Sequence, residues 1–258
     1  MSSTGFIGGG RVTRILLGGW ARAAALPTRV LVHDPDEKAL EALAATGVTF
    51  ERVSAREAAA ADVVFLALHP PAIPAALPDV KGSLSRDAVL VSLAPKIPLS
   101  ALAGAAGTSR VARMIPNAPS LIGQGYNPVA YGGGLDAAAK TELARLFAPW
   151  GEAPEVNEHH LEAYAILTGM GPTYFWFQWQ ALRDVAADFG LSQSDADHAL
   201  RAMLSGAVVT LWDAGLTPAA IMDLIPVKPM AEVAPTVDSA YRTLLPALHA
   251  KIQPVVAV

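Results

Sequence analysis

The sequence predicts an α/β domain with a mostly parallel sheet, followed by an all-α helical domain. Through the first part of the chain, short apolar runs alternate with Ala-rich helical stretches, a pattern typical of parallel strands joined by crossover helices. Beyond residue 157, strand-like runs disappear and long helical segments follow one another. We therefore expect two domains, residues 1–155 and residues 156–258, because one domain usually spans roughly 100–200 residues.

Short apolar runs mark the expected strands of the first domain. The run at residues 63–68 is the clearest, because it reads Val-Val-Phe-Leu-Ala-Leu and a parallel strand covered on both faces has consecutive apolar residues. The other expected strands are residues 4–7, 29–33, 89–93, 111–115 and 129–131.

The expected helices lie between these strands and fill the C-terminal domain. Residues 11–25, 35–45 and 99–106 are expected crossover helices, and residues 137–150 follow the last strand. Pro172 and Pro218 suit a first helical position, where the N–H has no intrahelical partner, and Ser192, Ser194 and Thr217 are candidate N-caps. The expected C-terminal helices are residues 158–167, 172–189, 194–214, 218–224 and 236–252.

The composition excludes several classes of protein. Lys and Arg total 19 against 23 Asp and Glu, without a basic run, so neither nucleic acid nor a membrane surface is an expected partner. No stretch reaches the roughly 18 apolar residues of a membrane span. There are no cysteines, which excludes disulfides and thiolate chemistry. The N-terminus, Met1-Ser2-Ser3-Thr4-Gly5, lacks the basic and apolar regions of an export signal, so we expect a cytoplasmic protein.

A glycine-rich loop follows the first expected strand and reads Gly8-Gly9-Gly10-Arg11-Val12-Thr13. Such a loop allows a tight turn from strand to helix and leaves the backbone bare enough for a pyrophosphate to approach the helix N-terminus. Thr13 stands where Gly or Ala is usual and should move the helix slightly away from the strand. Glycines at this place also fit a purely structural turn.

An acidic residue supports the dinucleotide interpretation. Asp34 ends the second expected strand, 24 positions after Gly10, where a carboxylate can accept hydrogen bonds from the ribose hydroxyls. Asp34 could also cap the next helix. A carboxylate would repel a 2′-phosphate, although Arg11 could offset some of this repulsion, so NAD is slightly favoured over NADP. Residues 1–155 are therefore an expected dinucleotide-binding Rossmann domain.

Four segments resemble the pyrroline-5-carboxylate reductase family. They are Gly5-Phe6-Ile7-Gly8-Gly9-Gly10, Asp62-Val63-Val64-Phe65-Leu66-Ala67-Leu68-His69-Pro70, Arg113-Met114-Ile115-Pro116-Asn117-Ala118-Pro119 with Gly123-Gln124-Gly125, and Thr168-Gly169-Met170-Gly171-Pro172-Thr173-Tyr174. The resemblance implies a Rossmann domain and a helical dimerisation domain, forming a homodimer or a higher homo-oligomer. It also implies that NAD(P)H reduces a cyclic imine carboxylate, which in the type reaction yields proline.

The expected cofactor and catalytic residues follow partly from this resemblance. Gly8, Gly9, Gly10, Arg11, Val12 and Asp34 would bind the dinucleotide, together with Leu68, His69 and Pro70. Pro116 and Asn117 follow a strand end, and the resemblance places them beside the nicotinamide and the substrate; a turn that closes the sheet is the alternative. His69 could contact the nicotinamide ribose, donate a proton, or simply be solvated.

The segment at residues 168–174 is the expected substrate site. Backbone N–H groups at a helix start suit a substrate carboxylate, and an interdomain turn is compatible with this role. Thr173 and Tyr174 are candidate proton donors, with Asn117 as a further catalytic candidate. The expected substrate-binding residues are Pro116, Thr168, Gly169, Met170, Gly171, Pro172 and Lys228.

The sequence also departs from the family pattern. Family members usually carry Lys at His69, Asn at Arg11 and Ser at Met170, and their S-P-G-G-T-T segment is replaced here by Leu224-Ile225-Pro226-Val227-Lys228-Pro229-Met230. That family segment helps to hold the substrate carboxylate, so its loss puts the substrate in doubt. Lys228 is either a solvated loop charge or a substitute for the missing contacts.

Two further features have structural interpretations. His159 and His160 are adjacent, so they point in different directions on a helix, and we expect a solvated helix start and no metal site. The aromatic run at residues 174–179 predicts a helix buried in the domain core or at a subunit interface, with an aromatic substrate wall as the alternative. Other functions remain open: reduction of a different imine or keto substrate, or a dinucleotide-binding regulator without catalysis.

Overall fold

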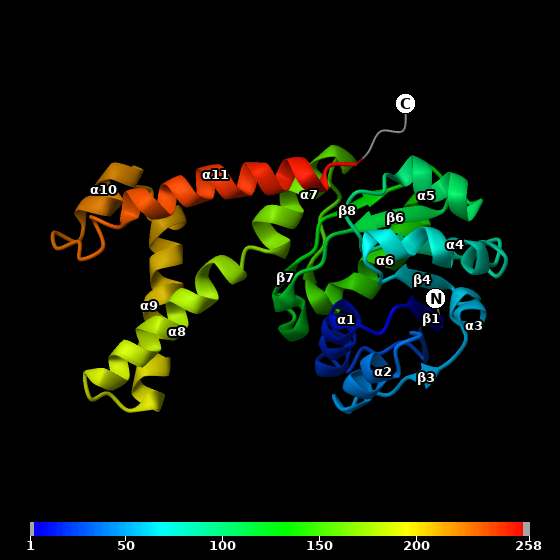
Figure 1. Cartoon of the computed structure of the whole chain (residues 1–258), viewed down its shortest axis with the longest axis horizontal. Coiled ribbons are helices and arrows are strands. Elements are labelled where there is room, and N and C mark those ends of the chain that lie inside the picture. Colours follow the sequence, from blue (N-terminus) through cyan, green and yellow to red (C-terminus); the bar gives the residue numbers. More distant parts are fainter. Residues whose placement is uncertain (1–2, 255–258) are drawn as a thin grey trace. The chain divides into compact units, whose positions relative to one another are not determined.

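The computed structural model describes residues 3–254, which divide into two compact units. The first unit comprises residues 3–170 and 248–254, and the helical unit comprises residues 171–247 (Figure 1). The expected boundary at residue 155 lies near the end of the sheet-forming part, whereas the first unit continues to Met170. Met1 and Ser2, part of the segment considered for an export signal, lie outside the described residues. Among residues 3–254, no helix is long and apolar enough to span a membrane.

Within the described residues, a seven-stranded sheet with the order β3-β2-β1-β4-β5-β6-β8 forms the centre of the first unit. All neighbouring pairs are parallel except β6 and β8, which are antiparallel, so the expected α/β class is confirmed. β3 was not expected, because its two exposed residues form no apolar run. The strands are β1 (Ser3–Ile7), β2 (Arg29–His33), β3 (Glu51–Arg52), β4 (Val63–Leu66), β5 (Val89–Ser92), β6 (Val111–Met114) and β8 (Val129–Tyr131).

Helices cover both faces of this sheet, and each layer has its own apolar core. One core contains side chains of α1 (Arg11–Arg22), α2 (Glu37–Ala44) and α6 (Ala137–Phe147). The other contains side chains of α3 (Ala55–Ala59), α4 (Ile73–Lys81) and α5 (Leu99–Ala106). Covering both faces explains why β4 and β5 are buried at every position.

Two buried tryptophans fix α1 against the sheet. The indole of Trp20 donates to the Leu146 carbonyl at 2.8 Å, and the indole of Trp150 donates to the Leu16 carbonyl at 2.8 Å. The two rings lie 4.6 Å apart between centroids, and Trp20 also meets Phe6 edge to face. Because both N–H groups have acceptors, these large rings stay buried without an unpaired donor, and α1 is held in one position above β1.

Irregular segments complete the first unit. The expected helix at 158–167 is divided into a 3₁₀ turn (Glu158–His160), α7 (Leu161–Tyr164) and a π-helical turn (Ala165–Gly169). Similarly, α6 ends at Phe147 and a 3₁₀ turn (Ala148–Trp150) follows it. A small parallel pair, β7 (Gly125–Tyr126) and β9 (Gly151–Glu152), was not expected from the sequence.

The helical unit contains the four helices expected there from the sequence: α8 (Thr173–Asp188), α9 (Gln193–Asp213), α10 (Pro218–Asp223) and most of α11 (Ala234–Ile252). The last turn of α11 belongs to the first unit. Ser192 caps α9 and Thr217 caps α10, each by accepting a backbone N–H at 3.2 Å, and Pro218 starts α10. Ser194 lies inside α9, and Pro172 is the residue before α8.

The aromatic run of α8 is exposed within the chain, which contradicts its expected burial in the domain core. The side chains of Phe175, Trp176, Phe177 and Trp179 are 45%, 48%, 68% and 37% exposed. Of the described α8 residues, only Ala186 is buried, and a helix that is apolar on most sides needs cover from another surface. The subunit interface remains the prediction for this helix.

Candidate functional site

A cavity of about 570 Å³ opens at the carboxyl ends of β1, β2, β4 and β5. Here the chain order reverses, because β1 lies between β2 and β4, and ligands of open parallel sheets bind at such a crossing point. The cavity is lined by Gly9, Gly10, Arg11, Val12, Arg14, Asp34, Ala39, Ala42, Ala67, Leu68, His69, Pro70, Ala72, Leu93, Ala94 and Pro95.

The glycine loop is shaped by two different requirements. Gly8 has φ +111°, and a Cβ there would lie 2.4 Å from the Ala67 carbonyl oxygen, so only glycine fits between β1 and β4. A Cβ on Gly10 would meet no atom within 4 Å, because this residue faces the open cavity. Gly8 is therefore required by the fold, and Gly10 leaves space for a ligand.

Thr13 ties the first turn of α1 to this loop. Its side chain is fully buried, and Oγ1 donates to the Gly8 carbonyl at 2.6 Å. The residue that departs from the usual Gly or Ala thus satisfies a buried carbonyl at the turn. A smaller residue would let the helix backbone pack closer to the strand; here the Thr13 hydroxyl holds the loop through a hydrogen bond instead.

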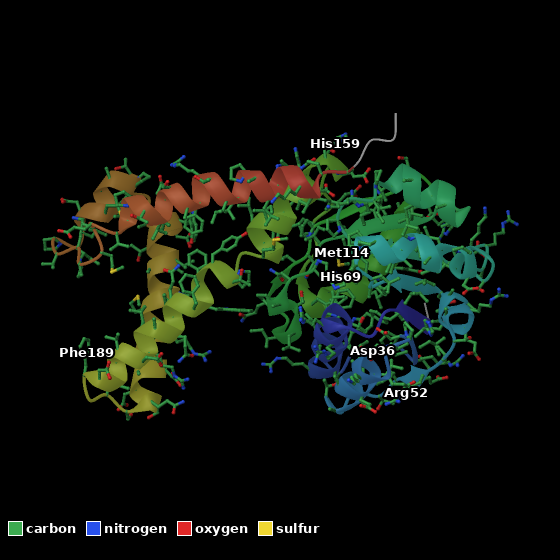
Figure 2. All side chains as sticks on the ribbon, viewed as in Figure 1. Asp36, Arg52, His69, Met114, His159 and Phe189 are labelled. Carbon is green, nitrogen blue, oxygen red and sulfur yellow. The ribbon has the colours of Figure 1, made fainter. Side chains whose placement is uncertain are left out.

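Asp34 is aimed at the glycine loop. Its Oδ2 accepts from the Gly9 N–H at 2.7 Å, and its Oδ1 accepts from the Asp36 N–H at 2.9 Å. Asp36, labelled in Figure 2, caps α2 by accepting the Lys38 N–H, so the helix-cap interpretation of Asp34 is wrong. Each carboxylate oxygen has two acceptor sites, so Asp34 can still accept hydroxyl groups from a ligand in the cavity.

Two arginines line the same cavity from α1. Arg11 and Arg14 lie in the first turn or just beyond it, and neither guanidinium pairs with a carboxylate within residues 3–254. α1 has no acidic residue in its first turn and no side-chain cap. Cations at a helix N-terminus oppose the helix dipole, so this arrangement favours a bound polyanion. Arg14 was missed from the sequence, although its spacing of three from Arg11 places both on one face.

The opposite wall of the cavity comes from β4 and β5. β4 ends at Leu66, before the expected strand end at Leu68, so Leu68, His69 and Pro70 all follow it. His69 is exposed just before a 3₁₀ turn (Pro70–Ala72) (Figure 2). Leu93, Ala94 and Pro95 follow β5 and were not singled out, although Leu93 ends an expected strand and Ala94 and Pro95 come directly after it. The cavity thus extends across the sheet from the end of β2 to the end of β5.

Pro116 and Asn117 follow β6 but do not line this cavity. Asn117 is buried; its Oδ1 accepts from the Tyr126 N–H at 3.2 Å and its Nδ2 donates to the Thr168 carbonyl at 3.3 Å. The amide therefore ties the end of β6 to the π-helical turn. Its expected catalytic and cofactor contacts stay predictions.

The π-helical turn packs closely against the end of β6. Thr168 donates its hydroxyl to the Tyr164 carbonyl at 2.9 Å, and a Cβ on Gly169 would lie 3.3 Å from the Ile115 side chain. π-turns occur frequently at functional sites, because they displace a few backbone groups from the helical pattern. The structure thus brings Pro116, Thr168 and Gly169 together, with Met170 ending the first unit.

The remaining expected substrate and catalytic residues lie in the helical unit: Gly171, Pro172, Thr173, Tyr174 and Lys228. Burial raises the pKa of Tyr174, whose ring meets that of Tyr241 edge to face at 5.9 Å. Lys228 is exposed between α10 and α11. His159 and His160 are exposed, and no group of three or more His, Asp or Glu side chains suited to a metal occurs in the described part of the chain.

Comparisons with known proteins extend over most of the chain. A model of the family described as "NADP oxidoreductase coenzyme F420-dependent" matches residues 3–96. Pyrroline-5-carboxylate reductase from Corynebacterium melassecola is 29% identical over 223 residues, covering 84% of this chain and 83% of the relative. The Escherichia coli enzyme of the same name is 27% identical over 224 residues, covering 86% and 83%.

The chain is thus similar to pyrroline-5-carboxylate reductases over more than four-fifths of its length. A solved structure of Plasmodium falciparum pyrroline carboxylate reductase with NADP bound matches with a TM-score of 0.75 and 21% identity, over 97% of this chain and 93% of that one. This likeness confirms the fold, a Rossmann-like domain with a helical C-terminal region. The similarity to the curated reductases and the match to the NADP oxidoreductase family model identify the protein as an NAD(P)H-dependent reductase.

Proposed function

We propose that this pyrroline-5-carboxylate reductase relative reduces a cyclic imine carboxylate, pyrroline-5-carboxylate or a close analogue, with NAD(P)H to give proline or the corresponding cyclic amine. The observation that supports the proposal is the cavity at the sheet crossing point, where Gly10 leaves space and Asp34 presents a carboxylate. The similarity to pyrroline-5-carboxylate reductases over more than four-fifths of the chain supports the substrate class.

The residues that line the cavity fit a dinucleotide. Asp34 would accept hydroxyl groups of the adenosine ribose, and the N-terminus of α1 with Arg11 and Arg14 would hold the diphosphate. Leu68, His69 and Pro70, with the segment 93–95, would then border the nicotinamide. When bound, the nicotinamide supplies a hydride, and the apolar wall excludes water from the transfer.

The substrate would be held near the end of β6 and the segment that follows the π-helical turn. Pro116, Thr168 and Gly169 are the proposed substrate contacts of the first unit, and the start of α8 is the proposed contact of the helical unit for the carboxylate. Thr173, Tyr174 or water would supply the proton that converts the imine nitrogen to an amine. Lys228 would supply a second positive contact to the carboxylate in place of the missing family segment.

A substrate panel tests the proposal directly. The purified protein is mixed with NADH or NADPH and with pyrroline-5-carboxylate, an uncharged pyrroline, or a keto acid, and cofactor oxidation is followed. We expect the cyclic imine carboxylate to give the highest kcat/KM. Preferential use of a keto substrate would reject the imine assignment. Tight cofactor binding without turnover of any compound would favour a dinucleotide-binding regulator without catalysis.

We also propose that a second copy of this chain covers the exposed aromatic face of α8. The helical unit leaves Phe177 68% and Trp212 71% exposed, which is more apolar surface than a small monomeric unit usually presents. Sedimentation at micromolar concentration should show no dominant monomer, and a monodisperse monomer would contradict this assembly. A cytoplasmic location, without nucleic-acid or membrane partners, stays our prediction.

A further inference from the structure

A buried cluster of one arginine and two glutamates lies under the end of β6. The side chain of Arg113 is fully buried, Glu162 is 1% exposed and Glu158 is 26% exposed. Arg113 Nη1 donates to Glu158 Oε1 at 2.9 Å, and Nη2 donates to Glu162 Oε1. Charges are placed in a protein interior only at a considerable cost in solvation, so a cluster of this kind needs strong mutual compensation.

Each glutamate also holds the backbone of the segment that runs from the end of β5 to the first residue of α5. Glu162 Oε1 accepts from the Lys96 N–H at 3.1 Å, and Glu158 Oε1 accepts from the Leu99 N–H at 2.6 Å. Lys96 has φ +75°, a conformation that a non-glycine residue keeps only where its surroundings enforce it. The same segment provides Leu93, Ala94 and Pro95 to the cavity wall.

The cluster also connects to the π-helical turn. Arg113 stands in β6 next to Met114, labelled in Figure 2, and four residues before Asn117, whose amide donates to the Thr168 carbonyl. Glu162 lies in α7, which continues directly into the π-turn that ends at Gly169. One guanidinium thus joins three segments that border the cavity or the expected substrate position: the end of β5, the end of β6 and the π-turn.

We propose that Arg113, Glu158 and Glu162 form a positioning cluster for the nicotinamide half of the cavity, a role that rests on the proposed function. Because Arg113 is fully buried, it does not contact a ligand in the cavity and is not a catalytic residue. The cluster sets the position of the Ala94–Pro95 wall and of Thr168. The adenosine half of the cavity, built from the glycine loop and Asp34, has no bond to this cluster among the described residues.

The test compares two ligands in three glutamate variants. ADP-ribose occupies only the adenosine and diphosphate part of a dinucleotide site, whereas NADH occupies the nicotinamide part as well. Glu162→Ala removes the acceptor of the Lys96 N–H and leaves Arg113 paired with Glu158. Glu162→Gln keeps an oxygen that can accept from both Lys96 and Arg113. Glu155→Ala, which breaks an exposed ion pair with Lys140 in the same unit, is the matched control.

We expect Glu162→Ala to bind ADP-ribose with an affinity within about twofold of the wild type. The same variant should have a kcat, or an NADH affinity, lower by about tenfold or more, because a displacement of about 1 Å at a reacting centre can lower the rate up to about a hundredfold. Glu162→Gln should recover most of the loss, and Glu155→Ala should show none. Equal losses for ADP-ribose and NADH, no recovery with glutamine, or no effect of alanine would each overturn the proposal.

A second variant guards against misfolding. If Glu162→Ala does not fold, Glu158→Ala replaces it, because Glu158 is partly exposed and its loss leaves Arg113 paired with Glu162. The same selective loss of nicotinamide-side function is expected. A wild-type protein that binds neither NADH nor ADP-ribose would refute the proposed function itself, whereas normal wild-type binding with equal losses in the variants would refute only the positioning role.

Discussion

Gly10→Val should abolish tight dinucleotide binding while leaving the fold intact. Gly10 has φ −73° and ψ −158°, an extended conformation open to any L-residue, and a Cβ would meet nothing within 4 Å. The valine side chain must therefore occupy the cavity beside the N-terminus of α1. A ligand diphosphate that loses one charge-assisted hydrogen bond there loses about 1.5–3 kcal/mol, or about 10- to 150-fold in Kd.

The assay is titration of the protein with NADH, paired with thermal unfolding. Gly10→Ala should show a smaller loss of affinity than Gly10→Val, and neither should lower the unfolding midpoint noticeably. Gly104→Ala is the matched control, because Gly104 in α5 also has nothing within 4 Å and does not line the cavity.

Gly8→Ala provides the contrast. Its Cβ would lie 2.4 Å from the Ala67 carbonyl oxygen at a φ of +111°, so this variant should unfold at a lower temperature than the wild type. Unchanged NADH affinity in Gly10→Val would show that no diphosphate approaches the loop. A large loss of stability in Gly10→Val would show instead that the space around Gly10 is too small for the valine side chain.

Four more outcomes follow from the same cavity and its surroundings. Asp34→Ser should shift preference toward NADPH, measured as the ratio of kcat/KM values; a wild type that already prefers NADPH strongly would contradict the role of Asp34. Arg14→Met should weaken NADH binding several-fold and make it less dependent on salt, since an unpaired cation near the helix N-terminus is removed; unchanged salt dependence would exclude contact with a phosphate. Burial raises the pKa of Tyr174 above its ordinary value of 10.0, so its hydroxyl stays protonated at neutral pH; kcat should be constant there and should fall only in more alkaline solution. If this hydroxyl is the proton donor, Tyr174→Phe should lower kcat roughly a hundredfold. A near-normal kcat in this variant would assign the proton to Thr173 or water. Lys228→Ala should raise KM for pyrroline-5-carboxylate by about tenfold or more without changing that for an uncharged imine, and equal, efficient use of pyrroline-5-carboxylate by both proteins would place the carboxylate contact elsewhere.

The parallel sheet could be predicted from the sequence because its strands are covered on both faces. β4 and β5 have consecutive apolar residues, and burial at every position follows from this pattern. α4 was not expected from the sequence: Pro74 occupies the first turn of this helix, where proline is tolerated, and Pro78 lies inside it, where proline usually breaks a helix. α3 is too short for a periodic pattern and depends on the capping box of Ser54 and Glu57.

The cofactor side of the site was predictable because it follows from local sequence. Asp34 comes directly after β2, and Gly10 and His69 come three residues after the ends of β1 and β4. The carboxyl ends of parallel strands meet at one edge of the sheet. The ion cluster of Arg113, Glu158 and Glu162 was not predictable, because it joins residues 45 and 49 positions apart through tertiary packing. Likewise, a single sequence does not indicate whether the aromatic face of α8 is covered by its own chain or by another.

The distribution of tryptophans gives the two units separate optical signals. Trp20 and Trp150 are fully buried in contact with each other in the first unit, whereas Trp176, Trp179 and Trp212 of the helical unit are 48%, 37% and 71% exposed. Indoles in water emit at longer wavelength than indoles in an apolar core. In the assembly proposed above, dilution that separates the subunits should therefore shift emission to the red through the second group alone. The near-ultraviolet circular dichroism of the Trp20–Trp150 pair should persist until the sheet itself unfolds.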